Sequence, residues 1–135
     1  HAGSMSQHEN YLSKIATNEY HFGVGFSEFI GKRNDAGITF SDNVLNGRAM
    51  FVLDANDATH LLLADEKGQR FVVDAKSANI EIVKLTTVDK TRQYSEVICK
   101  NLEAELLENS SDSSNPINQT IDAGRIMLAA DSLGA

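Results

Sequence analysis

The feature that most constrains this chain is a run of short β-strand patterns joined by turn sequences, with no helical spacing between them. Residues 38–45 and 48–54 flank the pair Asn46-Gly47. This pair favours a two-residue type I′ turn, because both of its positions tolerate a positive φ. The sequence therefore predicts a β-hairpin whose turn is Asn46-Gly47.

A second hairpin is predicted directly afterwards. Residues 60–64 and 69–74 flank the polar turn 65–68, in which Gly68 suits a left-handed position. Residues 79–88 are rich in β-branched side chains and predict a further strand. Because tight turns join antiparallel strands whereas parallel strands need long crossovers, the succession predicts an antiparallel meander of five or six strands.

The segment before these hairpins changes period. Residues 8–20 have apolar side chains at helical spacing, with Ser6 as the expected N-cap and Glu9 completing a capping box. Residues 22–26 then alternate between large apolar residues and glycine, which predicts a strand. Glycines in a strand indicate a bulge or a close approach of another backbone.

The segment after them contains two predicted helices. Residues 92–108 have apolar residues four positions apart and favour a helix, although the part 94–99 is also compatible with a strand. Residues 109–119 are rich in Ser and Asn and predict a polar loop. The chain ends with a predicted helix over 120–135, for which Thr120 is the expected N-cap.

Together these patterns predict an α+β domain with an N-terminal helix, an antiparallel meander sheet and two C-terminal helices. Residues 1–4 resemble a tag remnant ahead of Met5, and residues 5–108 form the single domain core. The helix at 120–135 is expected to pack on this core or on a partner.

Composition excludes several classes of protein. The 135 residues are 41% hydrophobic, and the longest uninterrupted apolar runs have five residues, far fewer than a membrane-spanning helix needs. The single cysteine, Cys99, lies in an apolar string and is expected to be buried. The absence of disulfides and of a signal peptide favours a cytoplasmic location.

The net charge of −7 is unevenly distributed. Residues 94–135 hold 7 of the 19 acidic residues but only 2 of the 12 basic ones, which argues against nucleic-acid binding. One interpretation is a solvated helix face, and the other is an acidic surface that binds a basic partner protein. The candidate partner-binding residues are Glu96, Glu103, Glu105 and Glu108.

No catalytic or cofactor motif is complete. The Gly23-Val24-Gly25 segment lacks the third glycine of a dinucleotide fingerprint, since Glu28 occupies that position. The segment around Ser27 lacks the last glycine of a nucleophile elbow, and the histidines lack metal-ligand spacing, so no cofactor or metal is predicted. A pocket between sheet and helices would have four polar candidates: His21, His60, Tyr94 and Arg48.

The leading functional hypothesis is a small, non-enzymatic protein-binding module of a bacterial or phage-like cell, with an inhibitor, immunity or chaperone-like role. The apolar C-terminal helix further suggests a homodimer. The alternative is a small-molecule-binding domain or an enzyme with a pocket between the sheet and the helices.

Overall fold

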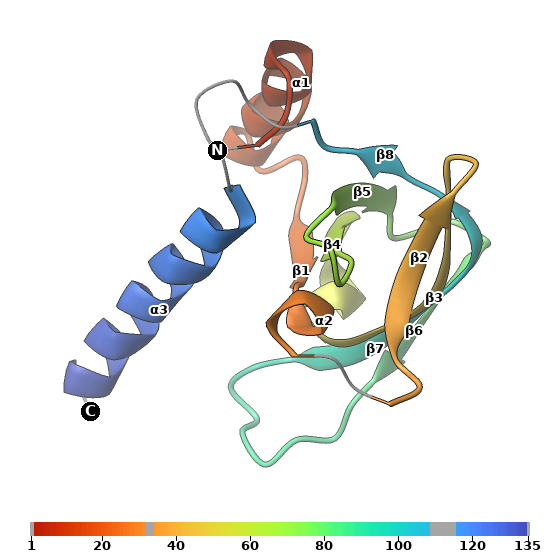
Figure 1. Cartoon of the computed structure of the whole chain (residues 1–135). Coiled ribbons are helices and arrows are strands. Elements are labelled where there is room, and N and C mark those ends of the chain that lie inside the picture. Colours follow the sequence, from red (N-terminus) through yellow and green to blue (C-terminus); the bar gives the residue numbers. More distant parts are fainter. Residues whose placement is uncertain (1, 32–33, 109–115, 135) are drawn as a thin grey trace.

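A computed structural model describes residues 2–31, 34–108 and 116–134. The strands of this part of the chain form one mixed sheet, and a short N-terminal helix and a longer C-terminal helix lie outside it (Figure 1). The strands are β1 (Phe22–Gly25), β2 (Gly37–Ser41), β3 (Val44–Leu53), β4 (His60–Ala64), β5 (Arg70–Asp74), β6 (Ile80–Lys84), β7 (Tyr94–Glu103) and β8 (Glu105–Leu106).

The strand order is β6-β7-β3-β1-β4-β5-β8, and β2 pairs with β3 off this path. Pairing is antiparallel except between β1 and β4, where Phe22 lies opposite His60 in a parallel register. The predicted simple meander with two C-terminal helices is therefore wrong. The reason is that β1 inserts between β3 and β4, and residues 26–59 provide the long crossover that a parallel pair requires.

The hairpin formed by β2 and β3 exists, but its turn lies earlier than predicted. Asp42 and Asn43 have φ of 52° and 62°, the positive values that a type I′ turn needs at both positions. Asn46 and Gly47 instead lie within β3, where its register with β7 shifts. Gly47 has a φ of 114°, and a Cβ atom there would lie 2.2 Å from the carbonyl oxygen of Gly37, so glycine is required by the approach of β2.

The second predicted hairpin is confirmed as β4 and β5. Its turn is closed by a hydrogen bond from the Asp65 N–H to the Gln69 carbonyl oxygen, and Gly68 has the expected positive φ of 80°. The strand predicted at 22–26 is confirmed as β1, and the strand predicted at 79–88 is present as the shorter β6, which ends at Lys84, so that residues 85–88 are not part of it.

The helix predicted over 92–108 is wrong, because this segment forms the ten-residue strand β7 and the short strand β8. Apolar residues four positions apart fit a period of two as well as a helix, so the spacing did not distinguish them. The buried residues of the first half alternate: Ser95, Val97 and Cys99. The strand interpretation left open for 94–99 is the correct one.

The helices begin earlier than predicted. Helix α1 spans Met5–Ala16, and its N-cap is Ser4 rather than Ser6, with Gln7 completing the capping box. A short helix α2 (Ser27–Ile30) and a 3-10 turn η1 (Ala55–Asp57) were not predicted. Helix α3 spans Pro116–Gly134, so 116–119 are helical and Thr120 is not the N-cap; residues 109–115 of the predicted loop lie outside the described residues.

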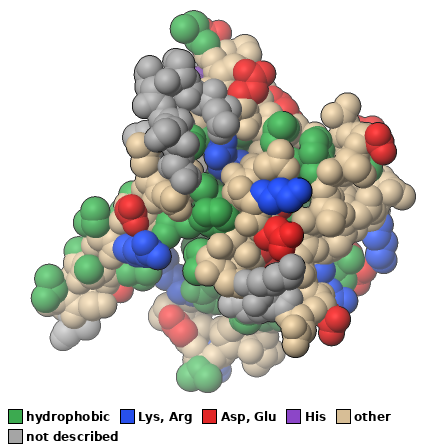
Figure 2. Space-filling model, in the orientation of Figure 1, with side chains coloured by type: hydrophobic (Ala, Val, Ile, Leu, Met, Phe, Trp, Pro, Cys, Tyr) green, Lys and Arg blue, Asp and Glu red, His purple; other side chains and the backbone are tan. Residues whose placement is uncertain are grey.

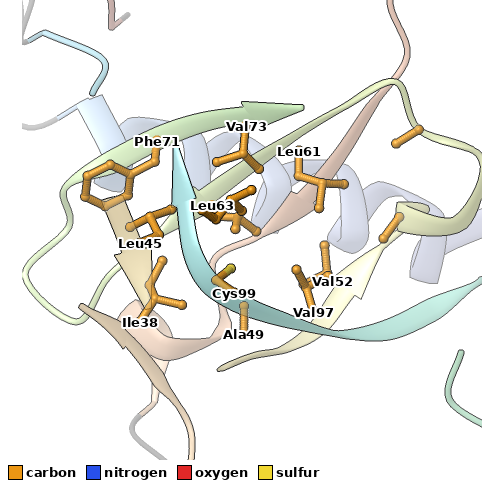
Figure 3. Close-up of a cluster of buried hydrophobic side chains, with 13 residues drawn as sticks. Ile38, Leu45, Ala49, Val52, Leu61, Leu63, Phe71, Val73, Val97 and Cys99 are labelled. Atoms are coloured by element: carbon orange, nitrogen blue, oxygen red, sulfur yellow. The ribbon is translucent and has the colours of Figure 1, made fainter. Parts of the chain in front are cut away.

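The core lies on the concave side of the curved sheet, where side chains from β2, β3, β4, β5 and β7 meet (Figure 3). Leu45, Leu61, Leu63 and Phe71 are completely buried. Cys99 is buried among them, as expected, and burial raises the pKa of its thiol to about 11. A thiol in this environment is an unreactive packing residue.

Helix α3 extends away from the sheet (Figure 1). Its buried residues are Pro116 and Ile117, in its first turn. Hydrophobic side chains are exposed along the rest of it (Figure 2). Met127 and Leu128 are among the exposed hydrophobic residues. Within the described residues, no helix combines the length and the hydropathy that crossing a membrane requires.

Candidate functional site

A β-bulge in β3 produces the most unusual backbone on the surface of the sheet. Ala49 pairs with Val97 and Val52 pairs with Ser95, so β3 carries one more residue than β7 over this stretch. Phe51 lies in the bulge, has a φ of 56°, and is 42% exposed. A left-handed conformation is rare for a bulky residue and is characteristic of sites where surrounding structure imposes it.

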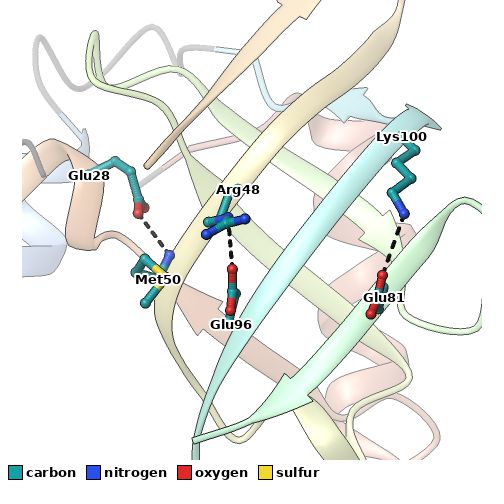
Figure 4. A network of polar contacts seen from close by, with 6 residues as sticks. All are labelled: Glu28, Arg48, Met50, Glu81, Glu96 and Lys100. Atoms are coloured by element: carbon teal, nitrogen blue, oxygen red, sulfur yellow. Dashed lines mark hydrogen bonds and ion pairs between the residues drawn. The ribbon is translucent and has the colours of Figure 1, made fainter. Parts of the chain in front are cut away.

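Helix α2 holds this bulge from one side (Figure 4). The Met50 N–H donates to Oε1 of Glu28 at 2.8 Å, and the Ser27 hydroxyl donates to the Met50 carbonyl oxygen. Glu28 is only 4% exposed, and its second oxygen lies 3.1 Å from the Ser27 hydroxyl oxygen. Side chains of α2 thus satisfy the Met50 backbone in place of a neighbouring strand, and this fixes the direction in which Phe51 points.

The position of α2 depends on β1. At Gly25 an added Cβ would lie 2.9 Å from a methyl carbon of Val52 and 3.0 Å from one of Leu63. At Gly25 the close approach is thus made by core side chains, whereas at Gly23 it is made by backbone, as predicted, because an added Cβ would lie 3.0 Å from the Leu53 carbonyl oxygen. The contact at Gly25 brings the end of β1, and α2 directly after it, against the bulge of β3.

Aromatic and charged side chains surround the bulge on the outer face of β3 and β7. Tyr94 meets the Phe51 ring edge-on, with centroids 6.5 Å apart. The Arg48 Nε lies 2.7 Å from Oε1 of Glu96, which gives this carboxylate an ion-pair partner. The surface thus offers an aromatic ring, a phenol hydroxyl and a guanidinium within a short stretch of two strands. Such a surface can bind a planar molecule with one apolar and one polar edge.

The four acidic partner-binding candidates do not share a surface, because the helix on which they were placed does not exist. Glu96 pairs with Arg48 on the outer face, and Glu103 lies opposite Val44 at the other end of β7. Glu105 joins β8 to α1. The backbone of Glu108 bonds to the N-terminal segment: its carbonyl oxygen accepts from the Gly3 N–H.

Glu105 makes its helix contacts through both carboxylate oxygens. One accepts from the Gln7 side-chain amide at 2.6 Å, and the other accepts from the Tyr11 hydroxyl at 2.5 Å. Burial and this hydrogen bond raise the pKa of the Tyr11 phenol well above its usual range. Glu105 therefore has a structural role at the α1 interface.

The four pocket candidates fall into two separate pairs. His60 belongs to an aromatic cluster under α1, with its ring centroid 4.1 Å from that of Tyr20, and burial lowers the pKa of its imidazole. His21 is adjacent to it, and its carbonyl oxygen accepts from the His60 N–H. Tyr94 and Arg48 lie at the bulge, on β7 and β3, and β1 separates these two strands from β4. A single pocket formed by all four is not present.

Sequence reasoning missed the residues that build the bulge. In the sequence, Glu28 stands out only because it occupies the place of the third glycine of a dinucleotide fingerprint, and Ser27 only because it lies in an incomplete nucleophile elbow. The available signal was a carboxylate inside the apolar run from Phe26 to Ile30. Buried carboxylates require specific hydrogen-bond partners, so such a residue marks a specific contact. Among the described residues, no group of three or more His, Cys, Asp or Glu could hold a metal ion.

No protein-family model and no curated protein sequence matches the chain. Solved structures do share its fold. Butyryl-CoA dehydrogenase from Megasphaera elsdenii is 20% identical, with a TM-score of 0.75, over 98% of this chain and 40% of that one. The electron transferring flavoprotein of Acidaminococcus fermentans is 21% identical, with a TM-score of 0.74 and the same coverage.

A third similar structure is the ChsE4-ChsE5 complex from Mycobacterium tuberculosis, 17% identical with a TM-score of 0.66, over 90% of this chain and 36% of that one. The chain thus spans about 40% or less of the length of these proteins. At this identity the likeness establishes the fold. It also overturns the hypothesis of a small non-enzymatic protein-binding module, because in these similar structures the fold is part of a dehydrogenase and of an electron transferring flavoprotein.

Proposed function

We propose that this chain is the β-rich portion of a flavin-dependent dehydrogenase or electron-transfer flavoprotein, and that the β3 bulge contributes to its flavin site. The observation that carries the proposal is the likeness to a butyryl-CoA dehydrogenase over 98% of this chain. The similar flavoprotein of Acidaminococcus fermentans is associated with flavin-based electron bifurcation. A bound flavin would supply the two-electron redox chemistry, which side chains alone do not provide.

The residues at the bulge fit a flavin ring system. The ring is planar, with an apolar benzenoid edge and a polar pyrimidine edge. Phe51 presents an exposed aromatic side chain for stacking, and the Tyr94 hydroxyl and Arg48 guanidinium provide hydrogen-bond donors nearby. The role of Glu28 is positioning, because its contact with the Met50 N–H keeps Phe51 in its left-handed conformation.

A protein partner forms part of the same proposal. The ChsE4-ChsE5 structure is a complex of two different chains. Helix α3 exposes Ile126, Met127 and Leu128. Exposed apolar side chains of this kind are typical of surfaces that are covered in an assembly. The partner is either a second copy of this chain or a different chain, and sedimentation velocity of the chain alone distinguishes the two.

The test is a titration of the chain with flavin adenine dinucleotide and flavin mononucleotide, followed by quenching of flavin fluorescence and by visible circular dichroism. We expect saturable binding. Replacing Phe51 with Ala should weaken it about tenfold, since a stacked ring contributes about 1–3 kcal/mol. Replacing Phe51 with Trp should preserve it, because the aromatic face is retained.

Val83→Ala is the matched control, because Val83 is an apolar residue of similar exposure, 38%, on strand β6, which β7 separates from β3. This variant should bind flavin as the parent chain does. Failure of the unaltered chain to bind either flavin would contradict the proposal. Equal weakening by Phe51→Ala and Val83→Ala would show that the flavin does not contact the bulge.

A further inference from the structure

The loop that joins β6 to β7 encloses a concavity whose charged lining residues are all basic. This loop, at the bottom of Figure 1, forms a hollow of about 430 Å³, within the size range of small-molecule sites. Its lining residues are Lys84, Leu85, Thr86, Thr87, Lys90, Arg92 and Gln93. The chain as a whole carries a net charge of −7, so a concavity lined by three cations departs from the general charge of the molecule.

The loop has a defined internal structure. The Leu85 N–H donates to the Tyr94 carbonyl oxygen at 2.9 Å and closes its base. At its tip, Oδ1 of Asp89 accepts from both the N–H and the hydroxyl of Thr91, at 2.8 and 2.6 Å. The Thr87 hydroxyl donates to the Asp89 carbonyl oxygen. The hollow is therefore shaped by hydrogen bonds within the loop.

The three cations are available to an anion. Among the described residues, no carboxylate lies within ion-pair distance of Lys84, Lys90 or Arg92. Asp89 is the acidic residue of the loop, and it does not line the hollow. Its hydrogen bonds with Thr91 and, to a smaller extent, the charge of Arg92 lower the pKa of its carboxyl group, which keeps it ionised in its turn.

We propose that this concavity binds a phosphorylated ligand that carries at least two negative charges, through Lys84, Lys90 and Arg92. Three cations exceed what a single carboxylate needs, whereas a diphosphate group can use all of them. The guanidinium of Arg92 can bind two phosphate oxygens at once, and the hydroxyl of Thr86 adds a neutral donor. The proposal does not depend on flavin binding at the β3 bulge.

The probe is inorganic pyrophosphate, titrated into the whole chain by isothermal calorimetry at low ionic strength. We expect saturable binding of one equivalent. Lys90→Ala and Arg92→Ala should each raise the dissociation constant about tenfold, because each removes a charge-assisted contact. Arg92→Lys should have an intermediate effect, since it keeps the charge and loses the two-oxygen contact.

Lys76→Ala is the control, because it removes an exposed positive charge outside the loop. It should leave pyrophosphate affinity unchanged. Equal weakening by Lys76→Ala and Arg92→Ala would mean that only net charge matters and would overturn the proposal, as would an absence of binding. Phe51→Ala should bind pyrophosphate normally, which separates failure of this site from failure of the flavin site.

Two further ligands identify the source of the phosphate. Adenosine 5′-diphosphate represents soluble nucleotides, and vesicles of phosphatidylcholine with phosphatidic acid represent lipid headgroups. Tighter binding of the nucleotide than of pyrophosphate, without vesicle co-sedimentation, would assign the site to a soluble ligand. Co-sedimentation that is lost in Lys90→Ala and Arg92→Ala would assign it to a lipid.

Discussion

Strand β3 and helix α3 differ in how their conformations are stabilised. Strand β3 pairs with β2 and β1 along one edge and with β7 along the other, and α2 packs against it. Helix α3 has nearly twice as many residues, yet its buried residues are in its first turn. The strand is held by residues from four other elements, whereas the helix depends on hydrogen bonds within itself.

This contrast explains where function is expected. Distant residues impose the two irregularities of β3: Glu28 binds the Met50 N–H, and the Asn46 side chain accepts from the Asn101 N–H. A backbone fixed by several neighbours can hold an unfavourable conformation such as that of Phe51. The exposed part of α3 has no such support, and we expect it to gain order from a partner.

The sharpest test of this contrast is removal of the contact that holds the bulge. Glu28→Ala leaves the part-buried Met50 N–H without its acceptor, and we expect the free energy of unfolding to fall by about 1–3 kcal/mol. The measurement is urea denaturation followed by circular dichroism. Glu28→Gln keeps an acceptor for the Met50 N–H and should cost about 1 kcal/mol. Equal losses in both variants would show that the charge, and not the hydrogen bond, holds the bulge.

A pair of glycine substitutions compares the two regions directly. Gly47→Ala in β3 places a Cβ atom against the Gly37 carbonyl oxygen at a φ of 114°, so we expect destabilisation of about 2 kcal/mol. Gly124→Ala in α3 meets nothing within 4 Å and should raise helix content, since alanine is favoured over glycine in helices by about 0.5–1 kcal/mol. Circular dichroism at the helix band and urea denaturation measure the two effects. A neutral Gly47→Ala would contradict the described register of β2 and β3.

The same contrast shows what could be predicted from sequence. The β4–β5 hairpin was predicted because its turn and its strands are adjacent in the chain. The β2–β3 turn was misplaced because Asn46-Gly47 carries the stronger local turn signal. In the structure, the Gly37 carbonyl oxygen packs against Gly47 and the Asn101 N–H donates to the Asn46 side chain, so both residues lie in an irregular part of β3. Local propensity is overridden where long-range contacts decide.

The candidate site was less predictable than the fold for the same physical reason. Phe51 is left-handed because Glu28 binds the adjacent Met50 across 22 positions of the chain, and no local pattern encodes that contact. The parallel pairing of β1 with β4 likewise depends on the long crossover between these two strands. Arg48 and Tyr94 were named as candidates, but their separation from the two histidines follows from strand order, which spacing does not reveal.

A smaller effect is expected from the ion pairs on the outer face. Arg48→Ala removes the partner of Glu96, whose side chain is only 16% exposed, and should lower the free energy of unfolding by about 0.5–1 kcal/mol. Lys100→Ala breaks a longer and more exposed contact with Glu81, 3.5 Å apart, and should cost about 0.3 kcal/mol or less. Urea denaturation at low and high salt measures both. Equal losses of unfolding free energy in the two variants would show that the burial of Glu96 does not strengthen its ion pair with Arg48.

The smallest effect is expected in α3. Leu128 is 66% exposed, so Leu128→Ala should change the free energy of unfolding of the isolated chain by less than about 0.5 kcal/mol. Loss of more than about 1 kcal/mol would show that α3 packs against something in solution, and sedimentation velocity on the same sample would then reveal an oligomer. If Leu128→Ala is neutral for the chain alone but destabilises a complex with a partner, the helix is ordered by association. That outcome would show that β3 and α3 differ in the source of their stabilising contacts. The strand is stabilised by contacts within the chain, whereas the helix is stabilised by contacts with another chain.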